Sequence, residues 1–179
     1  MKHPTRWIAI TAGVVALLLG VVFVVLVGAD DESTGGRLLG KEVPVFDLPT
    51  LDGAGVSSDD LAGRSYLVNF WNSWCVPCRQ EHPALVEFYE RHRDDRDFEM
   101  IGIVRDDTEK AARDYVEDEG VEWIVALDPE NRSALAFGTT GQPETFFVGP
   151  DGIVTGVHIG PASVARLEEM LAVARGLGQ

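Results

Sequence analysis

The sequence predicts an α/β domain with a mixed central sheet that is covered by helices on both faces. Between positions 66 and 137, short apolar runs typical of buried strands alternate with segments of helical character. The chain then continues with two apolar runs joined by Pro150-Asp151-Gly152, a turn signature, and ends in one amphipathic segment. Strands that alternate with helices favour parallel pairing, whereas the final hairpin adds antiparallel strands.

Each element of this domain is assigned from its own residues. The run YLVNFW at 66–71 predicts a buried strand, and the spacing of the apolar residues after it predicts a helix from Pro77 to about Arg93. Ser163 is expected to cap the last helix with its hydroxyl group, because an apolar stripe at helical spacing follows it. The other expected elements are strands at 98–104, 121–127, 144–148 and 153–159 and helices at 108–119 and 133–137.

A β-hairpin is expected to extend the domain at its N-terminal end. The segment from Val43 to Leu48 reads as a strand, and Asp52-Gly53 is a turn signature. Pro44 fits an edge strand, which has N–H groups to spare. We therefore place the folded domain at residues 41–179.

The N-terminal region predicts a membrane anchor. Residues 8–29 contain no charged side chain, and at about 1.5 Å per residue they span roughly 33 Å, enough for a bilayer core of about 30 Å. Basic residues precede this run and acidic residues follow it, so residues 1–7 are expected in the cytoplasm and the domain on the extracytoplasmic face. Residues 30–40 are polar and Gly-rich, which predicts a flexible tether.

A cleaved signal peptide is the alternative interpretation of the same segment. Val27 and Ala29 are small residues that fit the positions before a cleavage site. The apolar run nevertheless exceeds the usual signal-peptide core of about 7 to 15 residues, which favours an uncleaved anchor.

Charge and cysteine content narrow the function classes. The formal net charge is -14 and no run of Lys or Arg occurs, which argues against nucleic-acid binding. Two cysteines are too few for a stabilising disulfide framework, and a body of this size buries a sufficient core without one. The cysteines are therefore expected to perform chemistry.

The two cysteines form the motif Trp74-Cys75-Val76-Pro77-Cys78, which stands where a buried strand ends and a helix begins. The first turn of a helix presents free N–H groups and the positive end of the helix dipole, so it stabilises a thiolate at Cys75. Cys78 lies one turn further on, within reach of a mixed disulfide at Cys75. Such a pair can cycle between dithiol and disulfide.

A Cys-x-x-Cys motif can also serve three other roles. A zinc site would need more ligands, but only His82 stands near the motif and no second ligand pair follows. Covalent haem attachment requires His after the second cysteine, where this chain has Arg79. An inert structural disulfide stays open, although so short a loop gains little entropic stabilisation. We expect neither a metal nor another cofactor.

The chain resembles the thioredoxin superfamily, and within it the membrane-tethered thiol-disulfide oxidoreductases of the TlpA, ResA and DsbE (CcmG) family. Four stretches carry the resemblance across about 140 residues: GKEVPVFDLPTLDG, YLVNFWNSWCVPCRQEHPAL, VALDPENRSALAFGTTGQPETFFVGPDG and HIGPAS. The resemblance implies a thioredoxin-like fold. Asn69 stands where thioredoxins proper have a buried acidic residue, as is usual in this branch.

The resemblance also implies roles for individual residues. Cys75 becomes the attacking thiolate and Cys78 the resolving thiol of a redox-active disulfide. Glu81 matches an acidic residue that takes or returns the proton of Cys78, although most single Glu side chains on a helix are simply solvated. Pro143 matches the cis-proline opposite the active site, beside which the backbone of Gln142 would pair with an extended substrate.

Two aromatic residues and one histidine also lie near the motif. Trp74 is expected to pack on a partner's peptide, whereas Trp71 ends a buried strand and is expected in the core. His82 either tunes the cysteines electrostatically or is partly buried with a backbone hydrogen bond.

The function that the resemblance implies is reduction of disulfides in extracytoplasmic proteins, with the CxxCH pair of apocytochrome c during cytochrome c maturation as the expected substrate. Electrons would come from a membrane-embedded thiol transporter. A general extracytoplasmic disulfide reductase and a redox-inactive chaperone or scaffold are the alternatives, although the intact CVPC motif argues against the second.

Overall fold

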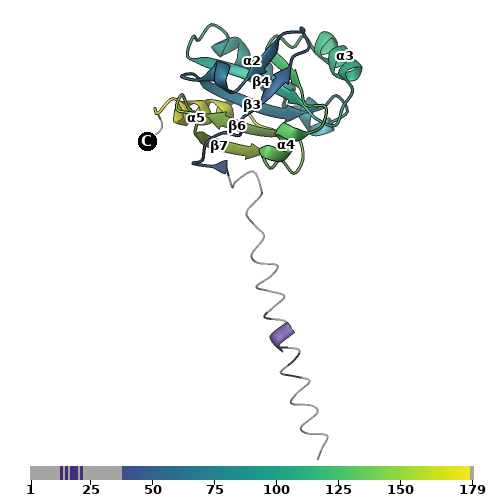
Figure 1. Cartoon of the computed structure of the whole chain (residues 1–179), viewed down its shortest axis with the longest axis vertical. Helices are drawn as coiled ribbons and strands as arrows, with labels where there is room; N and C mark the ends of the chain where they lie inside the picture. Colours follow the sequence, from purple (N-terminus) through teal and green to yellow (C-terminus); the bar gives the residue numbers. More distant parts are fainter. Residues whose placement is uncertain (1–12, 14, 16, 20, 22–37, 178–179) are drawn as a thin grey trace, which may run out of the picture. The chain divides into compact units, whose positions relative to one another are not determined.

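The computed structural model describes residues 13, 15, 17–19, 21 and 38–177. Its centre is a five-stranded sheet of order β5-β4-β3-β6-β7 (Figure 1). β3 pairs in parallel with β4, and β4 with β5, whereas β6 is antiparallel to both β3 and β7. The predicted mixed sheet is therefore confirmed. The strands are β3 (Ser65–Trp71), β4 (Phe98–Val104), β5 (Ile124–Leu127), β6 (Glu144–Val148) and β7 (Val154–Ile159).

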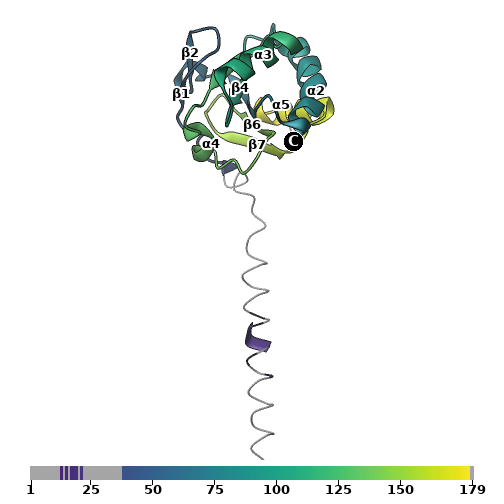
Figure 2. The same cartoon turned by 90° about the vertical axis from the view of Figure 1, so that its right-hand side faces the viewer.

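Three helices pack on one face of this sheet. The connections from β3 to β4 and from β4 to β5 step across the sheet in the same direction, so right-handed crossovers place both connecting helices on the same side. The C-terminal helix joins them on that face (Figure 2). These helices are α2 (Val76–His92), α3 (Glu109–Glu119) and α5 (Val164–Ala174).

The opposite face is covered by shorter elements and by the N-terminal hairpin (Figure 2). Their apolar side chains pack on the alternate residues of β3, so that every residue of this strand is buried. The expected helices on both faces are thus present. The elements are α4 (Arg132–Ala136), the strands β1 (Asp47–Pro49) and β2 (Gly55–Ser57), and the 3-10 helix η2 (Asp59–Leu61).

The hairpin differs from its prediction in position and in partner. Its first strand begins at Asp47 rather than at Val43, and β1 and β2 form a two-stranded sheet of their own. Pro44 has no N–H to donate, and the chain before it is instead tied to the turn ahead of β7, where the N–H of Val43 donates to Gly152 O at 2.9 Å. Beyond β1, Thr50 forms a bridge to Ala126 of β5.

The start of β5 also differs from its prediction. A strand was expected from position 121, but it begins at Ile124, because Gly120 ends α3 in a left-handed conformation and the N–H of Val121 donates to Val116 O at 3.0 Å. The predicted cap of α5 is confirmed, since Ser163 Oγ accepts from the N–H of Arg166 at 3.3 Å.

Most of the predicted anchor at 8–29 and most of the tether at 30–40 lie outside the described residues, so both stay predictions. Of the anchor, only residues 13, 15, 17–19 and 21 are described, and they are helical. Among the residues that the structure does describe, no helix is long and apolar enough to cross a membrane. The last tether residues, 38–40, are described: they form a turn in which the N–H of Gly40 donates to Val154 O at 2.8 Å.

Candidate active site

The two cysteines form a disulfide at the N-terminus of α2, with their Cα atoms 5.2 Å apart. Cys75 is the N-cap residue, and its Sγ accepts from the N–H of Cys78 at 3.0 Å. Pro77 lies in the first turn, where its missing N–H would have had no partner within the helix. A thiolate at Cys75 would therefore receive a backbone hydrogen bond as well as the favourable end of the helix dipole.

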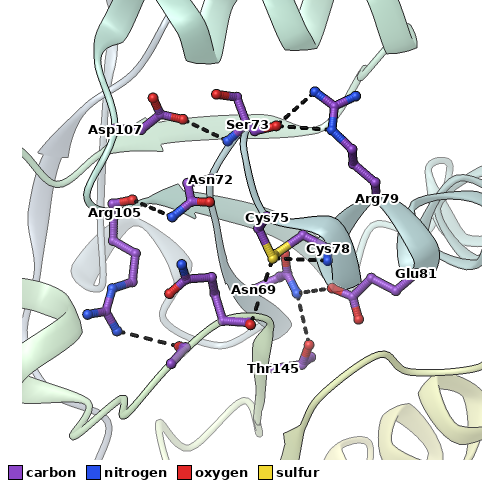
Figure 3. The surroundings of a disulfide bond; sticks show 12 residues. Asn69, Asn72, Ser73, Cys75, Cys78, Arg79, Glu81, Arg105, Asp107 and Thr145 are labelled. Atoms are coloured by element: carbon purple, nitrogen blue, oxygen red, sulfur yellow. Dashed lines mark hydrogen bonds between the residues drawn. A yellow bond between two sulfur atoms is a disulfide. The ribbon is translucent and has the colours of Figure 1, made fainter.

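The turn between β3 and α2 is fixed by its neighbours (Figure 3). The N–H of Ser73 donates to Asp107 Oδ2 at 2.7 Å, and the carbonyl of Ser73 accepts from Arg79 Nε at 3.1 Å and Nη2 at 2.8 Å. Asn72, which is fully buried, donates through Nδ2 to Arg105 O at 3.3 Å. These hydrogen bonds hold the turn that carries the disulfide. The side chains of Cys75 and Cys78 are only 4% and 5% exposed.

Glu81 lies in the protein interior, one turn after Cys78, with 1% of its surface exposed. Its Oε1 accepts from Asn69 Nδ2 at 2.8 Å, and its Oε2 accepts from the N–H of Ala162 at 3.0 Å. Burial raises the pKa of Glu81 to about 7, although these two hydrogen bonds act in the opposite direction. The solvated helix-surface position that is commonest for a Glu is therefore not the one it occupies.

Asn69 holds Glu81 in place from the central strand. The same Nδ2 group donates to Thr145 Oγ1 at 3.0 Å, so the amide bridges α2 and β6 (Figure 3). An amide at this position supplies a donor without adding a second negative charge. Two buried carboxylates side by side would raise each other's pKa further.

A small cavity adjoins both Cys78 and Glu81. Its volume is about 10 Å³, roughly the room that one water molecule requires. Trp71 Nε1 belongs to one of the side chains that line it, and within the described part of the chain this buried donor has no hydrogen-bond partner. The cavity thus has room for one water molecule between Cys78 and Glu81.

The aromatic and histidine side chains near the motif are divided between surface and core. Trp74 is 61% exposed beside the disulfide, and its Nε1 donates to Asp106 O at 3.1 Å. Trp71 is buried, as predicted. His82 is also buried, and its Nε2 lies 3.4 Å from Glu119 O, which matches the expectation of burial with a backbone contact.

The loop before β6 faces the disulfide. The Gln142–Pro143 peptide bond is cis, as the family resemblance implied. Gln142 O lies 3.8 Å from Cys75 Sγ, a contact that involves no donated hydrogen because the sulfur belongs to a disulfide. The structure therefore brings together the cysteines, Glu81 and this loop, although they are far apart in sequence.

Two charged residues that the sequence analysis did not single out also contact this loop. Arg105 donates through Nη1 to Thr139 Oγ1 at 2.6 Å, and Glu144 accepts through Oε1 from the N–H of Gly141 at 3.0 Å. A signal existed for Arg105, because it directly follows a parallel strand, and such strand ends face active sites in open α/β sheets. Glu144 had no comparable signal, since only the fold shows that it is buried.

The arrangement supports thiol-disulfide exchange. It provides a cysteine pair at a helix N-terminus, a buried carboxyl group that titrates near neutral pH, and an adjacent backbone carbonyl. In the described residues, no cluster of three or more His, Cys, Asp or Glu side chains could hold a metal ion.

Known proteins are similar to this chain in both sequence and fold. The Redoxin family profile matches residues 38–171. The chain is 34% identical over 162 residues to the thiol:disulfide interchange protein DsbE of Xylella fastidiosa, covering 89% of this chain and 80% of that protein. It is 32% identical over 133 residues to the thiol-disulfide oxidoreductase ResA of Bacillus thuringiensis, covering 74% and 76%.

A solved structure agrees with these sequence relatives. A thiol:disulfide interchange protein of the thioredoxin family from Chlorobium tepidum superimposes with a TM-score of 0.67 at 32% identity, over 74% of this chain and 94% of that chain.

Proposed function

The chain belongs to the Redoxin family and is a thiol-disulfide oxidoreductase, and on this premise we propose that it reduces disulfides in proteins outside the cytoplasm. The observation that carries the proposal is the Cys75–Cys78 disulfide at the start of α2, one helical turn before a buried Glu81 whose pKa is about 7. Unless Glu81 is protonated, it places negative charge near the thiolate of the reduced form. Such charge favours donation of electrons over their acceptance.

In this proposal Cys75 is the nucleophile. The reduced protein attacks one sulfur of the substrate disulfide with the Cys75 thiolate, so that a mixed disulfide forms and the other substrate sulfur leaves as a thiolate. The Cys78 sulfur then attacks the Cys75 sulfur, closes the disulfide seen in the structure and releases the second substrate sulfur. The substrate gains two electrons, and its two sulfurs leave as thiolates that take up protons from solvent. The Cys75 proton was lost to solvent when the thiolate formed, and the Cys78 proton is released in the second step.

Glu81 is proposed to accept the proton of Cys78 in the second step. Both side chains line the small cavity, and a carboxyl group with a pKa of about 7 is partly ionised at neutral pH, so it can both take up and release a proton. A water molecule in the cavity would carry the proton between them and onward to solvent.

Trp74, Gln142 and Pro143 are proposed to form the surface that recognises the substrate. The exposed indole of Trp74 offers apolar area beside the disulfide. The carbonyl of Gln142 lies 3.8 Å from Cys75 Sγ, so it is placed to accept a hydrogen bond from an extended peptide that approaches the disulfide.

We further propose that residues 8–29 anchor the domain to the extracytoplasmic face of the cell membrane, with the N-terminus in the cytoplasm. Extracytoplasmic spaces are kept oxidising, so the disulfide must be reduced again from a membrane-embedded thiol transporter. Apocytochrome c is the proposed substrate. The names DsbE and ResA belong to relatives and do not by themselves assign that substrate.

Trapping with a matched pair of variants tests these assignments. In membranes of the source organism, Cys78→Ser is expected to accumulate mixed disulfides with its substrates, because the resolving thiol is absent. Cys75→Ser is expected to accumulate none. Equal trapping by both variants would overturn the assignment of the nucleophile, and trapped partners without CxxCH motifs would contradict the apocytochrome substrate.

Fractionation tests the proposed location. The full-length protein is expected in the membrane fraction, with Cys75 labelled by a membrane-impermeant thiol reagent from outside the cell after reduction. Recovery of a soluble protein that starts near Asp30 would contradict the anchor, and labelling only from the cytoplasmic side would contradict the orientation.

A further inference from the structure

The loop of residues 139–142, which joins α4 to β6, decides where the active-site carbonyl lies. It has no regular secondary structure of its own. At its end, Gln142 O contacts Cys75 Sγ at 3.8 Å. A shift of this loop would move the carbonyl away from the sulfur without changing the cysteines themselves.

Arg105 holds the loop from the side of the Cys-x-x-Cys motif. Its Nη1 donates to Thr139 Oγ1 at 2.6 Å and to Gly141 O at 3.4 Å. The backbone of Arg105 is tied to the chain that leads into the motif, because its N–H donates to Trp71 O at 3.0 Å and its carbonyl accepts from Asn72 Nδ2 at 3.3 Å. One residue therefore connects the loop to the segment that carries the cysteines.

Glu144 holds the same loop from the side of β6. It is 1% exposed, and its Oε1 accepts three hydrogen bonds, from Thr140 N–H at 2.8 Å, Thr140 Oγ1 at 2.9 Å and Gly141 N–H at 3.0 Å. Burial of a carboxylate is unfavourable unless strong partners compensate it. All the partners given to Glu144 by the described part of the structure are loop groups, so its side chain orders the loop.

We propose that Arg105 and Glu144 are positioning residues that fix the loop 139–142 from its two sides and thereby set the Gln142 carbonyl for pairing with a disulfide-bearing peptide. Neither side chain is assigned a contact with the reacting sulfurs. A small dithiol needs no backbone pairing, so it reacts with the disulfide independently of the loop. The inference rests on the proposed recognition of extended substrates at Gln142.

The test compares two substrates on the full-length protein. The reactions are exchange with a disulfide-bearing peptide and exchange with dithiothreitol, measured for Arg105→Met, Arg105→Lys, Glu144→Leu and Glu144→Gln. Arg105→Met is expected to lower kcat/KM for the peptide at least tenfold, since tenfold corresponds to the loss of about one hydrogen bond to a charged group. The dithiothreitol rate is expected to stay within about twofold. Arg105→Lys and Glu144→Gln retain a donor or an acceptor and are expected to lose less.

Arg132→Met is the matched control, because Arg132 pairs with Glu130 on the surface of α4 and contacts no residue of the loop. It is expected to leave both rates unchanged. A ratio of peptide to dithiothreitol rates that stays constant in the Arg105 and Glu144 variants overturns the inference. If Glu144→Leu does not fold, the two Arg105 variants and Glu144→Gln decide the outcome alone.

The same experiment separates failure of this inference from failure of the proposed function. A wild-type protein that reacts with dithiothreitol but not with the peptide contradicts the proposed recognition of peptides, and the inference falls with it. A wild-type protein that reacts with both, alongside variants with an unchanged ratio, contradicts the positioning role only.

Discussion

Replacement of Glu81 by Gln is expected to change how the stability of the oxidised protein depends on pH. In the folded protein, burial raises the pKa of Glu81 from the ordinary 4.5 to about 7. At 1.36 kcal/mol per pH unit, ionising the buried carboxyl group costs about 3 kcal/mol more than ionising it in the unfolded chain. That is a large share of the about 5–15 kcal/mol by which a typical domain is stable.

The sign follows from proton binding in the two states. Below pH 4.5 the carboxyl group is protonated in both the folded and the unfolded protein, so no penalty applies. Between pH 4.5 and about 7 the unfolded chain has released the proton and the folded protein has kept it, so the free energy of unfolding falls as pH rises. Above about pH 7 both states are ionised and the full penalty of about 3 kcal/mol remains.

The assay is urea unfolding of the oxidised full-length protein in detergent micelles, at pH 4.5 and pH 8, for wild type and Glu81→Gln. The amide cannot ionise, so the variant escapes the penalty, and the difference in unfolding free energy between the two proteins should change by about 3 kcal/mol across this range. The amide also places an N–H₂ group against one of two donors, Asn69 Nδ2 and the N–H of Ala162. That cost does not depend on pH, so it cancels in the comparison.

Glu169→Gln is the matched control, because this carboxylate is mostly exposed and paired with Arg166 on the surface of α5. Its difference from wild type should change by only a few tenths of a kcal/mol over the same range. If the Glu81→Gln difference also stays constant with pH, Glu81 titrates like an exposed carboxylate. The proposal that it exchanges a proton with Cys78 at neutral pH would then be refuted.

The remaining predictions concern the redox couple, the core and a helix cap. The reduction potential, measured by equilibration in a dithiothreitol buffer, is expected below roughly -200 mV, and a value near about -120 mV would contradict a reductant. In Glu81→Gln the potential should rise at pH 8 but not at pH 5.5, since only an ionised carboxylate disfavours the thiolate. Gly102→Ala should destabilise the protein by about 1–3 kcal/mol in urea unfolding, because a Cβ there would lie 2.8 Å from Trp71 Nε1. Gly55→Ala is the control, because the atom nearest to its Cβ would be 3.6 Å away, and equal destabilisation by the two variants would refute the steric reason. Ser163→Ala should cost about 1 kcal/mol through loss of the α5 cap, and an unchanged urea midpoint would contradict this.

Local patterns in the sequence were enough for most of the architecture. The apolar run at 66–71 became the fully buried β3, and the hydroxyl of Ser163 became the cap of α5. These predictions succeed because periodicity and capping are properties of neighbouring residues. The predicted start of a strand was wrong where a segment distant in sequence supplies the hydrogen-bond acceptor. The N–H of Val43 donates to Gly152 O rather than to a strand of the hairpin.

The cysteine motif was also determined locally. Its position between a strand and a helix made Cys75 the N-cap residue, and Pro77 fits the first turn for the same reason. The reactive end of the site could therefore be located from five consecutive residues and the patterns on either side of them.

The environment of that motif was decided only by tertiary structure. Glu81 lies on α2, and whether a helix residue is exposed depends on which segments pack against its face of the helix. Two segments contact the Glu81 carboxylate: the loop before α5, through the N–H of Ala162, and β3, through Asn69. Arg105 and Glu144 lie 39 positions apart in the sequence, yet both hold the loop that faces Cys75. The sequence by itself thus determined which residues can react, because helix capping depends on neighbouring residues. The pKa of Glu81 and the position of the Gln142 carbonyl depend instead on contacts between distant segments, which form only when the sheet assembles.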